Sequence, residues 1–119
     1  MAGQHLTGIK RLVAAGKNSL AGLKTCWLNE EAFRQEIAIS IIGIPAGIYL
    51  GDNNIERVLL IGSLLVLLIT ELVNSAIEAA IDRISLERHE LSGRAKDLGA
   101  AAVLLAAILT AVTWLLILL

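Results

Sequence analysis

Cysteine, proline and aromatic residues are scarce in this chain of 119 residues, which has one cysteine, one proline and 3% aromatic residues. The single Cys26 excludes an intrachain disulfide framework and a cysteine-rich metal site, and we expect its thiol to be a small buried or interfacial group. The sequence also lacks a Walker segment and a kinase-type glycine-rich loop, which excludes the familiar soluble nucleotide-binding folds. An early apolar run with a cleavage pattern is missing, so we expect no signal peptide.

Charge is absent from three long stretches, which cover residues 37–51, 58–70 and 98–119. The last is long enough to cross a bilayer, which requires about 20 mainly apolar residues. The first two reach that length only when flanking polar residues are included. Because 56% of the residues are hydrophobic, we expect an all-α membrane protein. Its single domain of residues 1–119 would have three transmembrane helices, at about 30–51, 55–84 and 94–119.

Acidic residues are absent from residues 1–29. There, apolar residues recur at helical intervals while Lys10, Lys17 and Lys24 form another stripe. This pattern predicts an amphipathic helix at about 6–28 that lies on an anionic membrane surface. The alternative is an ordinary helix that packs on a neighbour.

Basic residues fall almost entirely before the first expected span and between the second and third, whereas the connection 52–57 has only Arg57. The positive-inside rule therefore predicts a cytoplasmic N-terminus and an external C-terminus. The net charge of −1 says little by itself. We expect no nucleic-acid partner.

A polar stripe interrupts the second expected span. Glu71 and Glu78 are almost two helical turns apart, so they share a face with the intervening Asn74, and Asp82 follows one turn later. Ionisable groups inside a span are costly and usually face a partner, a cavity or a pathway. The stripe is compatible with a catalytic site, with interhelical hydrogen bonds in an oligomer, or with an ion- or proton-conducting pathway.

Glu71 and Glu78 are expected to have different roles, because about 10 Å along the helix axis lies between them. This distance is too long for both to bind one small cation. Glu78 could share a small cation with Glu30, which is expected at the same membrane depth. Mg²⁺ suits such a site because it is often held by one or two carboxylates plus substrate phosphates. Glu71 lies deeper, where a base could meet a lipid headgroup.

The second polar connection could contact a phosphorylated ligand. Arg94 and Lys96 could neutralise phosphates, and Glu90 and Asp97 could accept hydrogen bonds. The alternative is a solvated loop.

Three segments, residues 27–36, 71–83 and 89–97, together resemble the bacterial integral-membrane diacylglycerol kinase family. The resemblance extends over almost the whole chain, in order and at family-like spacings. It implies a homotrimer of the bacterial inner membrane with active sites between subunits. The implied reaction transfers the γ-phosphoryl group of ATP, with Mg²⁺, to diacylglycerol and gives phosphatidic acid.

The resemblance also implies roles for individual residues. Glu71 would be the catalytic base, Glu30 and Glu78 would hold the metal, and Asn74 would support the site. The implied nucleotide-binding residues are Arg11, Asn18, Glu30, Glu78, Glu87, His89, Glu90, Lys96 and Asp97. The implied lipid-binding residues are Arg34, Gln35, Glu71, Ala100 and Trp114. Asn18 stands where the family has a bulkier aromatic residue, and Ala100 where it has a serine, so base and lipid contacts are expected to differ.

Two other functions compete with this interpretation. The related undecaprenol kinase shares the phosphoryl-transfer residues but accepts a polyprenol, and a lipid panel distinguishes the two. A conducting oligomer would instead show flux without ATP.

Overall fold

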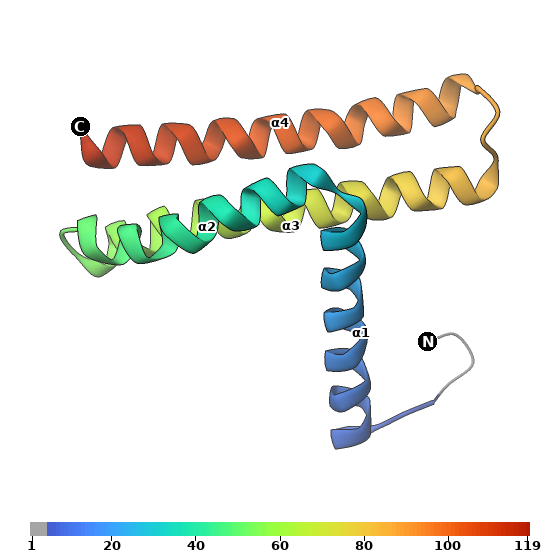
Figure 1. Ribbon diagram of the computed structural model, residues 1–119, viewed down its shortest axis with the longest axis horizontal. Helices are drawn as coiled ribbons and strands as arrows, with labels where there is room; N and C mark the ends of the chain where they lie inside the picture. The colour runs from blue at the N-terminus through green and yellow to red at the C-terminus, as the bar shows by residue number, and fades with distance from the viewer. Residues whose placement is uncertain (1–4) are drawn as a thin grey trace.

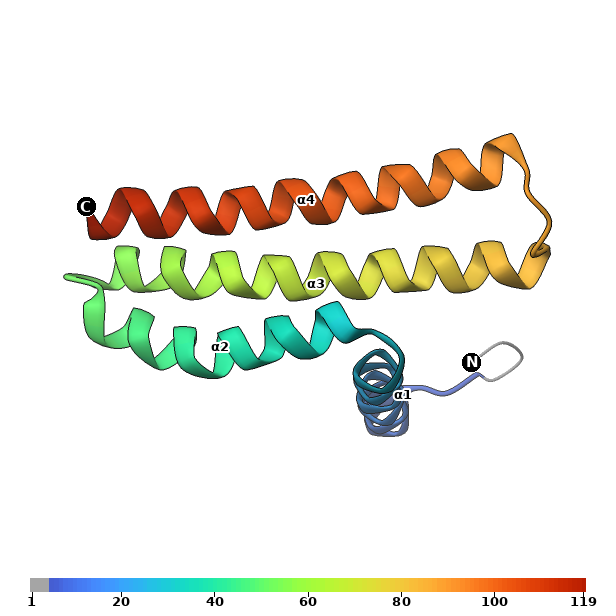
Figure 2. The same ribbon diagram turned by 45° about the horizontal axis from the view of Figure 1, so that its top comes forward.

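The computed structural model describes residues 5–119, which form four helices: α1 (Gly8–Asn29), α2 (Glu31–Leu50), α3 (Asn54–Ile84) and α4 (Glu90–Leu118). No strand occurs among these described residues. The helices α2, α3 and α4 run antiparallel to their sequence neighbours, with α3 in the middle (Figure 2). Helix α1 leaves this layered bundle steeply (Figure 1). All regular structure in the described part of the chain is therefore helical, as expected.

Side chains at the helix starts satisfy free backbone N–H groups. The Oδ1 atom of Asn53 accepts from the N–H of Glu56 at 2.9 Å, and the Glu56 carboxylate accepts from the N–H of Asp52 at 3.0 Å. At the start of α4, Nδ1 of His89 accepts from the N–H of Leu91 at 3.0 Å. This cap explains why α4 begins at Glu90, before the expected residue 94.

Two helices, α3 and α4, are long and apolar enough to cross a membrane. Helix α2 falls short of this criterion because its first turns carry charged residues, which leaves only residues 37–50 uncharged. The expected span at about 30–51, which corresponds to α2, therefore stays a prediction, as do the domain limits.

Helix α3 supplies most of the buried contacts. Leu60 and Leu64 are almost fully buried. Gly47 permits α2 to approach closely, since a Cβ there would lie 3.2 Å from Cβ of Leu60. Two donors on α4 bond to carbonyl oxygens of α3: Oγ1 of Thr110 to Ser63 at 2.9 Å, and Nε1 of Trp114 to Leu60 at 3.1 Å. Both neighbours are thereby aligned on α3.

The chain turns at Glu30, whose extended backbone separates α1 from α2. The Nη1 atom of Arg34 braces this corner by donating to the carbonyls of Trp27 and Leu28 at 2.7 and 3.4 Å. Apolar residues of α1 are left uncovered, with Leu12 and Leu20 each 68% exposed. The corner thus directs an amphipathic helix away from the bundle.

Candidate functional site

The predicted polar stripe follows one face of α3, and its burial decreases toward the connection to α4. Glu71 is 4% exposed and Asn74 is 9% exposed. Glu78 is half-buried, and Asp82 is exposed. The stripe therefore extends from the interior of the bundle to its surface.

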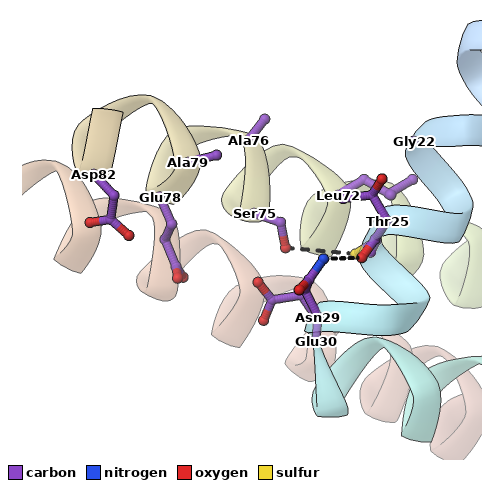
Figure 3. Close-up of a pocket in the computed structure, with 11 residues that line it drawn as sticks. Gly22, Thr25, Asn29, Glu30, Leu72, Ser75, Ala76, Glu78, Ala79 and Asp82 are labelled. Atoms are coloured by element: carbon purple, nitrogen blue, oxygen red, sulfur yellow. Dashed lines mark hydrogen bonds between the residues drawn. The ribbon is translucent and has the colours of Figure 1, made fainter. Parts of the chain in front are cut away.

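Glu78 and Glu30 face a common cavity of about 480 Å³, which we call the carboxylate pocket. Its other lining residues are Gly22, Thr25, Cys26, Asn29, Leu72, Ser75, Ala76, Ala79 and Asp82. Figure 3 shows the two carboxylates reaching toward the same space, one from α3 and the other from the corner between α1 and α2. Two residues distant in sequence are thus brought together.

Asn74 links the buried and exposed parts of the stripe. Its Nδ2 atom donates to Oε1 of Glu78 at 3.0 Å. Its Oδ1 atom is buried and lacks a hydrogen-bond partner in the part of the chain that the structure describes. This oxygen packs against Gly99 of α4. The amide therefore orients one of the pocket carboxylates.

The oxygens of the carboxylate pocket suit a hard divalent cation. Residues 5–119 contain no cluster of three or more His, Cys, Asp and Glu side chains that could enclose a metal. Two carboxylates match Mg²⁺, which keeps several waters and is completed by substrate phosphates. The residues present therefore fit Mg²⁺ bound together with a phosphorylated ligand.

Glu71 lies deeper than the pocket, about 10 Å from Glu78 along the axis of α3. It is near enough to Glu30 and Glu78 to interact with their charges. Glu36 of α2 lies near enough to Glu71 for the two negative charges to repel each other. The buried Oε1 atom of Glu36 has no hydrogen-bond partner among the described residues. Glu36 was not among the predicted site residues, although it lies within a segment that carried the family resemblance.

A second cavity, of about 330 Å³, lies at the connection between α3 and α4, and we call it the loop hollow. It gathers Asp82, Glu87, His89 and Lys96. Nζ of Lys96 pairs with Oδ1 of Asp82 at 2.8 Å. Because Asp82 lines both cavities, it joins the carboxylate pocket to the loop hollow.

The other predicted nucleotide residues are not brought to these cavities. Arg11 and Asn18 are exposed on α1, and Asp97 is exposed on α4. Glu90 pairs with Arg94 at 3.5 Å on the surface. In this single chain, the predicted nucleotide residues are therefore divided among α1, the carboxylate pocket, the loop hollow and the exposed start of α4.

The predicted lipid residues are dispersed. Gln35 and Ala100 are exposed, whereas Arg34 braces the corner. Trp114 lines a separate apolar hollow of about 390 Å³, together with Gly43, Leu64 and Thr110 among others. That hollow lies toward the other end of α4, so it is not part of the carboxylate pocket.

Cys26 and Ser75 line the carboxylate pocket although neither was a predicted site residue. The sulfur of Cys26 lies 3.7 Å from Oγ of Ser75, a contact that joins α1 to α3. Burial raises the pKa of the Cys26 thiol above its ordinary value, and the contact with Ser75 opposes this rise. The position of Ser75 beside the polar stripe was the signal available in the sequence, while Cys26 offered none beyond its rarity.

Comparison with known proteins identifies relatives along almost the whole chain. The family described as prokaryotic diacylglycerol kinase matches residues 17–118. A relative from Escherichia coli (strain K12), named diacylglycerol kinase, is 48% identical over 110 residues, which cover 92% of this chain and 90% of the relative. Proteins of the same name from Haemophilus influenzae and Pseudomonas aeruginosa are 47% and 48% identical, over 91% and 95% of this chain and 92% of each relative.

Proposed function

The chain belongs to the prokaryotic diacylglycerol kinase family, and on that premise we propose how its residues phosphorylate diacylglycerol. The enzyme is a lipid kinase, and its donor is the γ-phosphoryl group of ATP. Phosphoryl transfer relies mainly on positioning and charge stabilisation. A carboxylate pocket beside a buried glutamate supplies both requirements in a small helical protein.

The catalytic unit is a homotrimer of the bacterial inner membrane. Helices α2, α3 and α4 span the bilayer, and α1 lies on its cytoplasmic surface with the basic stripe toward anionic headgroups. The distribution of basic residues supports a cytoplasmic N-terminus and an external C-terminus. The exposed positions of Arg11 and Asn18 support a site completed by a neighbouring subunit.

The depth of the site fits a reaction between a lipid and a soluble nucleotide. Helix α3 has 31 residues, whereas a hydrocarbon core of about 30 Å requires about 20. A span that begins near Val58 therefore ends near Glu78. Glu78 then lies at the cytoplasmic interface, and Glu71 lies within reach of a lipid headgroup.

Glu30 and Glu78 would hold Mg²⁺ with the phosphates of ATP. When bound, the cation neutralises charge that develops on the phosphate oxygens. Asn74 orients Glu78 through the hydrogen bond from Nδ2. Lys96 adds a positive charge at the loop hollow, held there by Asp82. Arg11, Asn18, Glu87, His89, Glu90 and Asp97 complete the nucleotide site.

Glu71 acts as the general base. Its carboxylate accepts the proton of the diacylglycerol hydroxyl as that oxygen attacks the γ-phosphorus. The new oxygen–phosphorus bond forms while the bond from the γ-phosphorus to the bridging oxygen breaks, so the products are phosphatidic acid and ADP. Arg34, Gln35, Ala100 and Trp114 contact the lipid.

The observation that carries this assignment is the convergence of Glu30 and Glu78 on one cavity beside a buried Glu71. The test is a radiolabelled ATP assay of purified protein against short-chain diacylglycerol and a polyprenol. We expect phosphorylation of diacylglycerol alone, and loss of that activity in Glu71→Gln with the oligomer intact. Normal turnover by this variant would exclude Glu71 as the base. Preference for the polyprenol would identify the chain as an undecaprenol kinase instead.

A further inference from the structure

We propose that Gly99 is a positioning residue for the metal site, because its lack of a side chain lets Asn74 hold Glu78 in place. The inference rests on the metal role proposed for Glu78. It extends that role to a residue of another helix, one to which the proposed chemistry assigns no function.

Gly99 is buried where α4 crosses the polar stripe of α3. A Cβ atom at this position would collide with Oδ1 of Asn74 and lie 3.3 Å from its Cγ atom. It would also lie 3.8 Å from Cδ1 of Ile77. Any residue other than glycine therefore requires the Asn74 side chain to move.

The Asn74 amide is held from one side only. Its Nδ2 atom donates to Oε1 of Glu78 at 3.0 Å, whereas its buried Oδ1 atom has no partner among the described residues. Because the amide is planar, a displacement of Oδ1 also displaces Nδ2. No bond to Oδ1 opposes such a rotation. Crowding at Gly99 is thus transmitted to the hydrogen bond on Glu78.

Glu78 lines the carboxylate pocket together with the carboxylates of Glu30 and Asp82. Loss of a hydrogen bond that orients a metal ligand typically weakens metal binding by about 10- to 100-fold. We therefore expect Gly99→Ala to weaken binding of the metal–nucleotide complex by roughly 10-fold or more.

The experiment uses the purified full chain in detergent. Its probe is the Mn²⁺ complex of a non-hydrolysable ATP analogue, since Mn²⁺ accepts the same oxygen ligands as Mg²⁺. Electron paramagnetic resonance measures bound Mn²⁺ during the titration, so the readout does not depend on turnover. Wild type and Glu78→Gln define the full and the impaired site.

Two glycine variants serve as controls. Gly62→Ala, also in a helix, introduces a Cβ with nothing within 4 Å, and we expect no loss of stability and unchanged Mn²⁺ binding. Gly47→Ala crowds Leu60 at 3.2 Å, away from the carboxylate pocket. We expect it to lower stability but not Mn²⁺ affinity, so it separates a packing defect from a positioning defect.

A double-mutant cycle completes the test. Asn74→Ala removes both the hydrogen bond and the clash, so Gly99→Ala should weaken binding no further in that background. The double variant should also assemble normally if Gly99→Ala alone does not. The positioning role would be overturned if Gly99→Ala bound Mn²⁺ with wild-type affinity. It would also be overturned if the losses of affinity in Gly99→Ala and Asn74→Ala multiplied in the double variant. Either result would leave the proposed metal role of Glu78 in place. Normal binding by Glu78→Gln would overturn the positioning role together with the proposed metal role.

Discussion

Near the C-terminal end of α4, Thr110 and Trp114 donate to backbone carbonyls of α3 at 2.9 and 3.1 Å. Near its N-terminal end, Lys96 instead pairs with the Asp82 carboxylate, and Gly99 lies against the amide of Asn74. The first end joins two helices with hydrogen bonds of neutral groups. The second end leaves an amide oxygen unpartnered and carboxylates facing a cavity.

The two ends of the α3–α4 pair therefore serve different purposes: one end stabilises the packing of the helices, and the other presents groups for chemistry. Buried polar groups normally find partners, and each exception requires an explanation. Both orphaned oxygens described here, on Glu36 and Asn74, belong to side chains near Glu71 or Glu78. Changes at the two ends should therefore affect different measurements.

The largest expected effect comes from removing charge in the carboxylate pocket. We expect Glu78→Gln to lower kcat/KM at limiting Mg²⁺ by about 100-fold or more, since a neutral amide is a poor ligand for a hard cation. Excess Mg²⁺ should restore part of the activity. A kinetic titration with Mg²⁺ measures this, and a uniform loss at every Mg²⁺ concentration would contradict metal binding by Glu78.

The opposite end should respond in stability rather than in turnover. Thr110→Val removes the donor to the Ser63 carbonyl, and interhelical hydrogen bonds of this kind contribute about 0.6 kcal/mol on average in membranes. We expect the free energy of unfolding to fall by about that amount while kcat stays unchanged. The Thr110 hydroxyl also reaches the Ala106 carbonyl of its own helix at 3.0 Å. Thr70→Val is the matched control because its hydroxyl bonds to the Val66 carbonyl within its own helix. A large loss of kcat in Thr110→Val would contradict the idea that this end of α4 contributes to stability and not to turnover.

The ion pair between Asp82 and Lys96 should contribute little to stability, because both side chains are nearly half exposed, at 47% and 44%. We expect Asp82→Asn to raise KM for ATP several-fold and to change the free energy of unfolding by less than about 1 kcal/mol. Asp52→Asn removes the same charge from the connection between α2 and α3 and should change neither quantity. An unchanged KM in Asp82→Asn would show that Lys96 does not depend on this partner.

The smallest expected effect is on the rate at which the Cys26 thiol is alkylated, and this rate can be tested by its dependence on pH. Its raised pKa leaves less thiolate near pH 8 than an exposed thiol has, and the thiolate is the reactive form. Alkylation should therefore be several-fold slower than that of a free thiol at pH 8 and should continue to accelerate above the ordinary pKa. Modification adds bulk to the carboxylate pocket, so inactivation should follow labelling and be slowed by nucleotide. Cys26→Ala should resist inactivation.

The helices and the polar stripe could be predicted because they depend on local pattern. Uncharged runs indicated α3 and α4, and helical spacing placed Glu71, Asn74 and Glu78 on one face. The pairing of Glu30 with Glu78 followed from membrane depth, and the two residues share a cavity.

Contacts between helices could not be predicted in the same way. The approach of Gly99 to Asn74 depends on the rotation of α4 about its axis, which no spacing within α4 specifies. The bond from Trp114 to the Leu60 carbonyl likewise pairs a side chain with a distant backbone. Both contacts arise from tertiary packing. The start of α4 at Glu90 has a local cause instead, since Nδ1 of His89 caps the helix by accepting from the N–H of Leu91.

The corner at Glu30 has a mechanical consequence. The residue at which the chain changes direction also presents a carboxylate to the pocket, so the angle between α1 and α2 sets where that carboxylate lies. A thicker or thinner bilayer changes the tilt of spanning helices, while a surface helix stays in the headgroup plane. With α2 as a span and α1 as a surface helix, as proposed above, that mismatch would change the angle between the two helices at Glu30. Host-membrane thickness should then alter the Mg²⁺ requirement, which an assay in phosphatidylcholines of graded chain length measures.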